Sequence, residues 1–411
     1  MPRNNQFRHQ SYPTEPAVKP VVLDLSPDVD EDIDFSRLHS EFGVSHVELV
    51  HGTFTGSDPF GIHAWMRSAV AEASPAVQLA LTPAIAKLEE RTKKLTDTVR
   101  GDVANYDEKY RAEFQELAGD ELVVSRLEPA WSSQNTHLAR AALAVRLLCR
   151  FADLQEQGLD LRHERIMLWG HSHGGNGFAL LTNLLANDRA SVDAFFDSAG
   201  DALGEDGERA KEILAATDGP HPLAQSLIIV TFGTPVRYGW DSDGYCQLLH
   251  VLHHRPADED RPAATVPAMG NGRGGEEVAP DEVGPLYQNI LDALFARHGD
   301  WLQMFAVAGT DLRPTVYREE NLALGKYLER SLPQPTPEAF RDRLPIVRRR
   351  WQSATRMHAE GQNLLVQFEP IGRTRFGSAI HRSVFGHAVY TSRNWLPRQL
   401  KLVLEHLQEG E

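Results

Sequence analysis

A serine flanked by glycines, Ser172, has the surroundings expected of a nucleophile. It lies in the pattern Gly-His-Ser-His-Gly at 170–174, between the apolar run 165–169 and a Leu-rich helical pattern. A serine between a strand and a helix sits on a sharp, strained turn that needs small neighbours, which Gly170 and Gly174 provide. The amino end of the following helix would direct the N–H of His173 at a carbonyl that develops negative charge. We predict that Ser172 is a nucleophile; the alternative is a structural Gly-Ser turn.

An earlier turn could complete a site for negative charge. The segment HVELVHGTFTG at 46–56 is a strand ending in a turn at Gly52, about 120 residues before the serine. A backbone N–H from such a loop is the usual second donor to a tetrahedral intermediate, and Thr53 is the candidate. Gly52 and Phe54 are expected to belong to the same substrate-binding turn. An ordinary strand-end turn is the alternative.

Four segments in this order carry a resemblance to a known family. VHGTFTG, WGHSHGGN, VTFGTPVRYG and FGHAVYTSRNW together resemble the lipase and esterase branch of the α/β-hydrolase superfamily, over roughly residues 44 to 405. The resemblance implies a nucleophile, an acid and a histidine in that chain order, acting on carboxylic esters that include lipid acyl esters. It implies an acyl-enzyme mechanism without a metal or another cofactor.

The acid has more than one candidate. Asp311 follows the apolar run Gln303 to Ala308, which we expect to be a strand, and would lie at the edge where the other functional turns lie. Asp311 is therefore preferred. Asp241, after the preceding predicted strand, is the alternative. Asp300 precedes its predicted strand and is expected at the opposite edge of the sheet, so it is not selected.

The base is expected in the loop after the last predicted strand. Two histidines lie there, His381 and His387, before a final amphipathic helix. His387, next to Gly386 and close to that helix, matches the family's position better, and His381 is the alternative. In the expected mechanism His387 takes the proton of Ser172 and Asp311 holds the imidazole in the required tautomer.

Apolar runs and helical patterns alternate along the chain. Runs typical of buried strands cover 46–50, 165–169, 227–232, 303–308 and 363–368, with a further candidate at 121–127. Helical patterns cover 84–117 and 135–155. This alternation predicts an α/β fold with a mainly parallel sheet covered by helices on both faces. With the resemblance, it predicts an α/β-hydrolase fold with inserted cap or lid segments.

The domain organisation follows from the remaining segments. Residues 1 to 20 are polar and lack apolar periodicity, so we expect a disordered tail before one domain at 21–411. Segments 188–226 and 241–300 interrupt the alternation and are expected to be insertions. Three histidines in the second segment, His250, His253 and His254, are expected in a loop.

Composition limits the class of protein. The chain has 411 residues, 41% of them hydrophobic, a formal charge of −15 and two cysteines. Such acidity argues against a nonspecific nucleic-acid binder, and two cysteines cannot form a disulfide framework. No segment has the roughly 20 apolar residues of a membrane span, nor is there a secretory signal pattern, so a cytoplasmic address is expected. The expected partner is a small-molecule or lipid ester. Thioester or amide cleavage and a catalytically silent binding protein remain alternatives.

Overall fold

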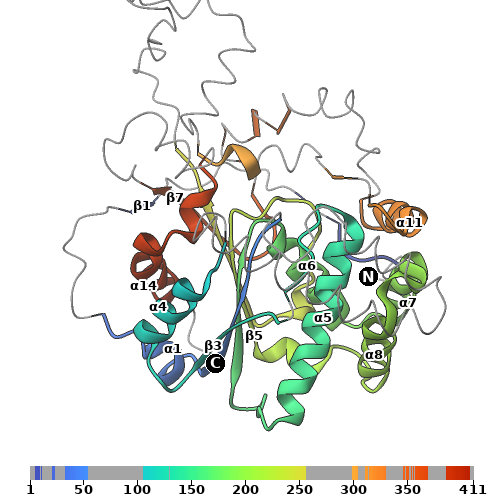
Figure 1. The fold of residues 1–411 in the computed structure, drawn as a ribbon, viewed down its shortest axis with the longest axis horizontal. Helices are drawn as coiled ribbons and strands as arrows, with labels where there is room; N and C mark the ends of the chain where they lie inside the picture. Colours follow the sequence, from blue (N-terminus) through green and yellow to red (C-terminus); the bar gives the residue numbers. More distant parts are fainter. Residues whose placement is uncertain are drawn as a thin grey trace, which may run out of the picture.

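The computed structural model describes residues 5–9, 11, 21–23, 33–53, 105–128, 130–255, 299–303, 311–312, 314–329, 346–347, 349–350, 353, 355, 357–368 and 386–407. Within these ranges, seven strands form one sheet in which every pairing is parallel (Figure 1). Across the sheet the order is β1-β7-β6-β5-β4-β2-β3. The strands are β1 (Val21–Leu23), β2 (Val44–Val50), β3 (Val123–Arg126), β4 (Arg165–His171), β5 (Leu227–Phe232), β6 (Gln247–His253) and β7 (Gln362–Phe368).

Helices cover both faces of the sheet, which gives three layers (Figure 1). One face packs against α5 (His137–Glu156), α6 (His173–Leu185), α7 (Arg189–Ala199) and α8 (Gly204–Ala215), with α11 (Arg318–Leu328) lying on α5 and α7. The other face packs against α1 (Arg37–Ser40), α4 (Glu108–Ala118) and α14 (Leu396–His406). The two hydrophobic cores therefore lie on opposite sides of the sheet.

The strand sequences explain this burial. β5 reads LIIVTF and all six residues are buried, as expected for a parallel strand with helices on both faces. Its even and odd positions separate the two cores, with Ile229 on the α5 side and Ile228 on the α14 side. Local signals set the helix starts: Thr136 caps α5 by accepting the N–H of Ala139, and Asp107 caps α4 in the same way.

The strand order contains a reversal of direction at β2 and β4. β2 leads through α4 to β3 at the edge, and the chain then returns through α5 to β4 on the other side of β2. The first described helix after β2, α4, and the helix after β4, α6, therefore lie on opposite faces of the sheet. In open α/β sheets, ligands bind in the crevice outside the carboxyl ends of the strands at such a point.

Most of the predicted strands are confirmed, as is the coarser prediction of a parallel α/β architecture. The runs at 46–50, 121–127, 165–169, 227–232 and 363–368 correspond to β2, β3, β4, β5 and β7. The predicted strand at 303–308 is wrong at its first residue, because 301–303 form a helical turn; 304–308 lie outside the described residues. Of the helical pattern predicted at 84–117, residues 105–117 are described, and α4 begins within them at Glu108.

The expected insertion at 241–300 is wrong in its first part. β6 lies inside it, between β5 and β7 in the sheet. The three histidines expected in a loop lie on β6 and just after it, and all are buried. The segment 188–226 contains α7, α8 and a 3-10 helix at Pro222–Ser226, and it forms part of the crossover from β4 to β5.

The N-terminal tail is also a correction, for residues 5–9. Phe7 is buried, and its ring stacks on Phe195 with centroids 4.9 Å apart. The backbone N–H of Phe7 donates to the hydroxyl of Tyr327, and that of Arg8 donates to Asn183. The segment is polar apart from Phe7, and the residues against which Phe7 packs are far away in the sequence, so nothing in the sequence indicated this contact. Among the helices of the described ranges, none is long and apolar enough to cross a membrane.

Candidate active site

Ser172 occupies a strained turn between β4 and α6. Its φ is 55° and its ψ −131°, a conformation rarely adopted by a residue with a side chain. Its N–H donates to the carbonyl of Phe232 at 2.8 Å, and its own carbonyl accepts the hydroxyl of Thr234 at 3.0 Å. The turn is thus tied to the end of β5. Such strain persists where surrounding structure enforces it, and it is typical of functional sites.

The glycines around Ser172 are required by close packing, as the sequence predicted. A Cβ on Gly170 would lie 2.2 Å from the ring of Phe178, and a Cβ on Gly174 would lie 2.8 Å from the carbonyl oxygen of His51. Both distances are shorter than any real carbon contact. The chain therefore crosses itself closely on both sides of the serine, and only glycine fits.

The turn after β2 lies directly against the serine. A Cβ on Gly52 would lie 2.8 Å from the Cβ of Ser172. The indole of Trp131 donates to the carbonyl of His51 at 3.1 Å and stacks on its ring, which fixes the start of this turn. Thr53 follows and is partly exposed. The expectation that Gly52 adjoins Ser172 agrees with this packing. The role of Thr53 stays a prediction, and Phe54 lies outside the described residues.

An aspartate–histidine pair lies at the same edge of the sheet. His387 Nδ1 is 2.7 Å from Oδ2 of Asp300, and both side chains are buried. Asp300 follows Gly299, and its N–H donates to the carbonyl of His253 at the end of β6. The other carboxylate oxygen accepts the N–H of Gln303 at 2.9 Å. Both carboxylate oxygens of Asp300 therefore have hydrogen-bond partners.

The pair and the serine meet at one dipeptide, 232–233. Phe232 accepts the N–H of Ser172, and a Cβ on Gly233 would lie 2.9 Å from Oδ2 of Asp300. Gly233 has φ of 61°, so the backbone there also favours glycine. This geometry places the carboxylate of Asp300 and the Ser172 turn on neighbouring positions at the carboxyl end of β5.

His387 is positioned from several sides. His171 Nε2 lies 3.3 Å from the carbonyl of His387 and donates to it, and the two rings are 4.4 Å apart. The residues flanking His387 are attached to β6: the carbonyl of Gly386 accepts from His253 Nδ1, and the hydroxyl of Tyr390 accepts the N–H of His253. His171, the residue before the expected nucleophile, thus also orients the expected base.

The structure does not bring Asp311 to His387. Its carboxylate lies instead against two buried arginines, 2.8 Å from Nη2 of Arg140 and 2.6 Å from Nη2 of Arg237. These cations hold the pKa of Asp311 well below its usual range against the opposing effect of burial. The expectation that Asp311 partners His387 is therefore wrong, and the expected placement of Asp300 at the opposite edge is wrong as well.

Asp241 is the alternative acid and His381 the alternative base. Asp241 begins a 3-10 helix at Ser242–Gly244, where it accepts the N–H of Asp243, and it forms an ion pair with Arg8 at 3.4 Å. It is not the partner of His387. His381 lies outside the described residues.

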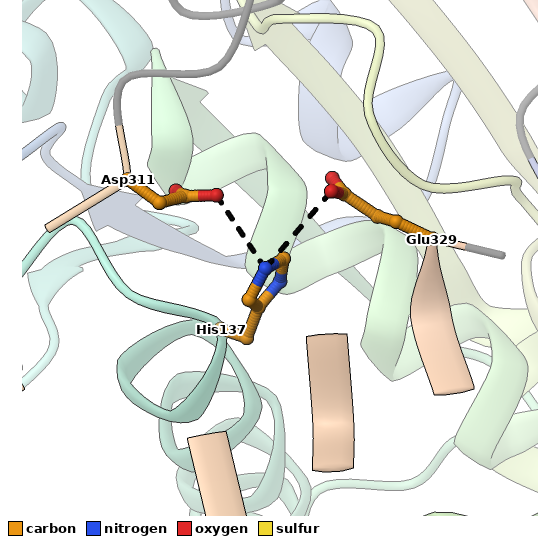
Figure 2. A group of neighbouring side chains, drawn as sticks. All are labelled: His137, Asp311 and Glu329. Atoms are coloured by element: carbon orange, nitrogen blue, oxygen red, sulfur yellow. Dashed lines mark ion pairs between the residues drawn. The ribbon is translucent and has the colours of Figure 1, made fainter. Parts of the chain in front are cut away.

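A histidine and two carboxylates of this region have ligand-like spacing (Figure 2). The ligand atoms of His137, Asp311 and Glu329 lie within 4.8 Å of one another. Both carboxylates, however, already carry arginine partners: Arg237 spans them, with its Nε 2.6 Å from Glu329, and Arg140 contacts Asp311. Two guanidinium groups beside two carboxylates leave no excess negative charge for a divalent ion. We interpret this group as a buried ion-pair network.

His137 takes part in this network as a neutral group. Its Nδ1 lies 2.8 Å from the hydroxyl of Tyr238, and burial is the main cause that lowers its pKa, although Asp311 and Glu329 oppose the shift. The network joins α5, the end of β5 and the segment of α11. Arg140 connects the network to the residue after Ser172, because its Nη1 lies 3.4 Å from Nδ1 of His173.

Comparisons of the chain with family models, with curated proteins and with solved structures returned no match.

Proposed function

We propose that the chain is a serine hydrolase of the α/β-hydrolase type that cleaves carboxylic esters through an acyl-enzyme on Ser172. The observation that carries this proposal is the arrangement around β5. The strained Ser172 turn is tied to Phe232, and the buried Asp300–His387 pair lies against Gly233. A nucleophile, a base and an orienting acid on one sheet edge are the groups that acyl transfer requires.

The proposed roles follow from hydrogen-bonding chemistry. Asp300 accepts the Nδ1 proton of His387, so the Nε2 of that ring is left as the acceptor. His387 Nε2 would take the proton of Ser172 as its oxygen attacks the acyl carbonyl, and would later return it to the leaving alcohol. Asp300 stabilises the imidazolium formed between these steps. Water then releases the acid in the same way.

The negative tetrahedral oxygen needs donors on the other side of the serine. The N–H of His173, at the first position of α6, and the N–H of Thr53 in the turn after β2 are the proposed donors. The close approach of Gly52 to Ser172 supports this second assignment, because a residue with a Cβ would push the turn away. The dipole of α6 favours the same charge.

Hydrolysis kinetics test the proposal. Purified protein is assayed with p-nitrophenyl esters of increasing acyl length, with a matched thioester and with a matched anilide, alongside Ser172→Ala and His387→Asn. Ester hydrolysis that both substitutions abolish is expected. Preference for the thioester or the anilide would reassign the leaving group while keeping the mechanism. A wild-type rate no greater than that of Ser172→Ala on all three substrates would favour a catalytically silent binding protein.

A further inference from the structure

The side chain of His173 has a defined hydrogen-bonding state. Its Nδ1 lies 3.1 Å from the amide nitrogen of Asn176 and 3.4 Å from Nη1 of Arg140. A guanidinium can only donate hydrogen bonds. His173 Nδ1 must therefore be an acceptor, which leaves the ring neutral with its single proton on Nε2.

Arg140 cannot turn away from this contact. Its side chain is fully buried, with Nη2 on Asp311, Nε on the hydroxyl of Tyr238 at 2.8 Å, and Nη1 also on Asn135 at 2.9 Å. Each donor group thus has a fixed partner. The ion-pair network behind the active site holds a cation against Nδ1 and so opposes protonation of His173.

Electrostatics point the same way and locate the ring. Burial, followed by the charges of Arg140 and Arg237, lowers the pKa of His173 well below its ordinary value, and charge on His387 contributes in the same direction. The ring of His173 is therefore within electrostatic range of both the buried network and the proposed base. The lowered pKa of His173 favours the neutral ring.

The protonated nitrogen of His173 is left without an acceptor. Nε2 is buried and has no hydrogen-bond partner within the part of the chain that the structure describes. Buried donors are nearly always satisfied, so an unsatisfied one calls for a physical reason. His173 directly follows Ser172 in the chain, at the first position of α6.

We propose that the imidazole of His173 is a catalytic hydrogen-bond donor: held neutral by Arg140, it presents its Nε2–H to an oxygen of the acyl substrate bound at Ser172. This role adds a side-chain donor to the expected backbone donors. It rests on the proposed function.

Two substitutions separate this role from packing. His173→Gln replaces the ring by an amide, whose oxygen can accept from Arg140 while its nitrogen donates as Nε2 does. His173→Leu keeps an apolar volume but removes the donor. We expect Leu to lower kcat with p-nitrophenyl esters about 100-fold, in the range found for loss of one donor to a tetrahedral intermediate, and Gln to restore at least a tenth of the wild-type kcat. Equal kcat for Leu and the wild type, or equal losses for Leu and Gln, would overturn the proposal.

A spectroscopic readout is independent of turnover. In protein labelled with ¹⁵N-histidine, the signals absent from the His173→Gln spectrum are assigned to His173. We expect the Nε2–H tautomer at pH 7, and a downfield shift of that proton when a fluorophosphonate forms a tetrahedral adduct on Ser172. An Nδ1–H tautomer, or a proton that does not shift on adduct formation, would contradict the role of His173.

These measurements distinguish the two levels of the proposal. If Ser172→Ala abolishes activity and adduct formation while His173→Leu behaves as the wild type, the proposed function stands and the role of His173 fails. If Ser172→Ala is as active and as readily labelled as the wild type, the proposed function itself fails.

Discussion

Asp300→Asn separates the observed pair from the one that the sequence favoured. In the native protein, one carboxylate oxygen of Asp300 accepts the N–H of Gln303 and the other lies 2.7 Å from His387 Nδ1. An asparagine would keep its oxygen toward Gln303, because the N–H of Gln303 needs an acceptor and an NH₂ group can only donate. The amide nitrogen would then face His387.

The consequence is a change of tautomer. Facing a donor, His387 Nδ1 must accept, so the ring proton moves to Nε2 and the base can no longer take the proton of Ser172. Loss of the correct tautomer in a Ser-His-Asp triad lowers kcat by about 10⁴-fold, which corresponds to about 5 kcal/mol of activation free energy. The side chain keeps its size, so we expect little change in the folded structure.

The assay is ester hydrolysis at saturating substrate, with Asp241→Asn as the matched control. Asn at 241 can still accept the N–H of Asp243, so we expect it to retain the wild-type kcat. Retention of more than a tenth of kcat in Asp300→Asn, or a greater loss in Asp241→Asn, would refute the reasoning about which acid orients His387.

Three further predictions concern packing, charge and pH. Gly52→Ala would place a Cβ 2.8 Å from that of Ser172 and so push the two turns apart. Because a displacement of about 1 Å of a reacting group can cost about 100-fold, we expect kcat/KM for ester hydrolysis to fall by about that factor. A wild-type kcat/KM would show that the two turns do not need this close contact. Asp311→Asn leaves buried arginine charge uncompensated and should lower the free energy of unfolding by about 3 kcal/mol or more in urea titrations, whereas an unchanged midpoint would count against the network. Burial lowers the pKa of His253 to about 4 in the folded protein. Between pH of about 6.5, the pKa in the unfolded chain, and pH of about 4, the unfolded chain therefore binds a proton that the folded protein does not. Stability should therefore fall as pH drops from about 6.5 to 4, and His253→Asn, whose amide can donate to Gly386 in place of Nδ1, should flatten that decline; an equally steep decline in the variant would exclude His253 as a source.

The sequence was most informative where function depends on neighbouring residues. The Ser172 turn combines a buried strand, two glycines and a helix within about twenty residues, and each part is visible as a local pattern. The conformation of Ser172 and the packing against Gly170 agree with that prediction. β5 was equally clear, because a strand buried on both faces is a continuous apolar run.

Asp300 was missed because its position depends on distant structure. β6 is interrupted by His250 and lies after a Gly- and Asp-rich turn, which disguised it as part of an irregular segment. Asp300 returns to the end of β6 more than forty residues later, through its hydrogen bond to His253. Because β6 was not predicted, nothing in the sequence indicated that Asp300 lies beside the end of a strand. Asp311 was the nearest acid that follows an apolar run.

Phe7 and Arg140 illustrate the same limit. Phe7 packs against the rings of Phe195 and Tyr327, and the carboxylate partner of Arg140 is 171 residues away in the sequence. Such pairings follow from how the layers pack. The lowered pKa of His173 likewise depends on its burial and on the charge of Arg140 from another helix, neither of which is encoded by spacing in the sequence.

Covalent labelling of Ser172 tests the central claim most directly. The protein is treated with a fluorophosphonate, digested, and analysed by mass spectrometry to locate the adduct, with Ser172→Ala and His387→Asn treated in parallel. We expect one adduct per chain on the peptide containing Ser172, none in Ser172→Ala, and much slower labelling in His387→Asn. Absence of an adduct on wild-type Ser172, or labelling that is equal in all three proteins, would contradict the assignment of Ser172 as the nucleophile.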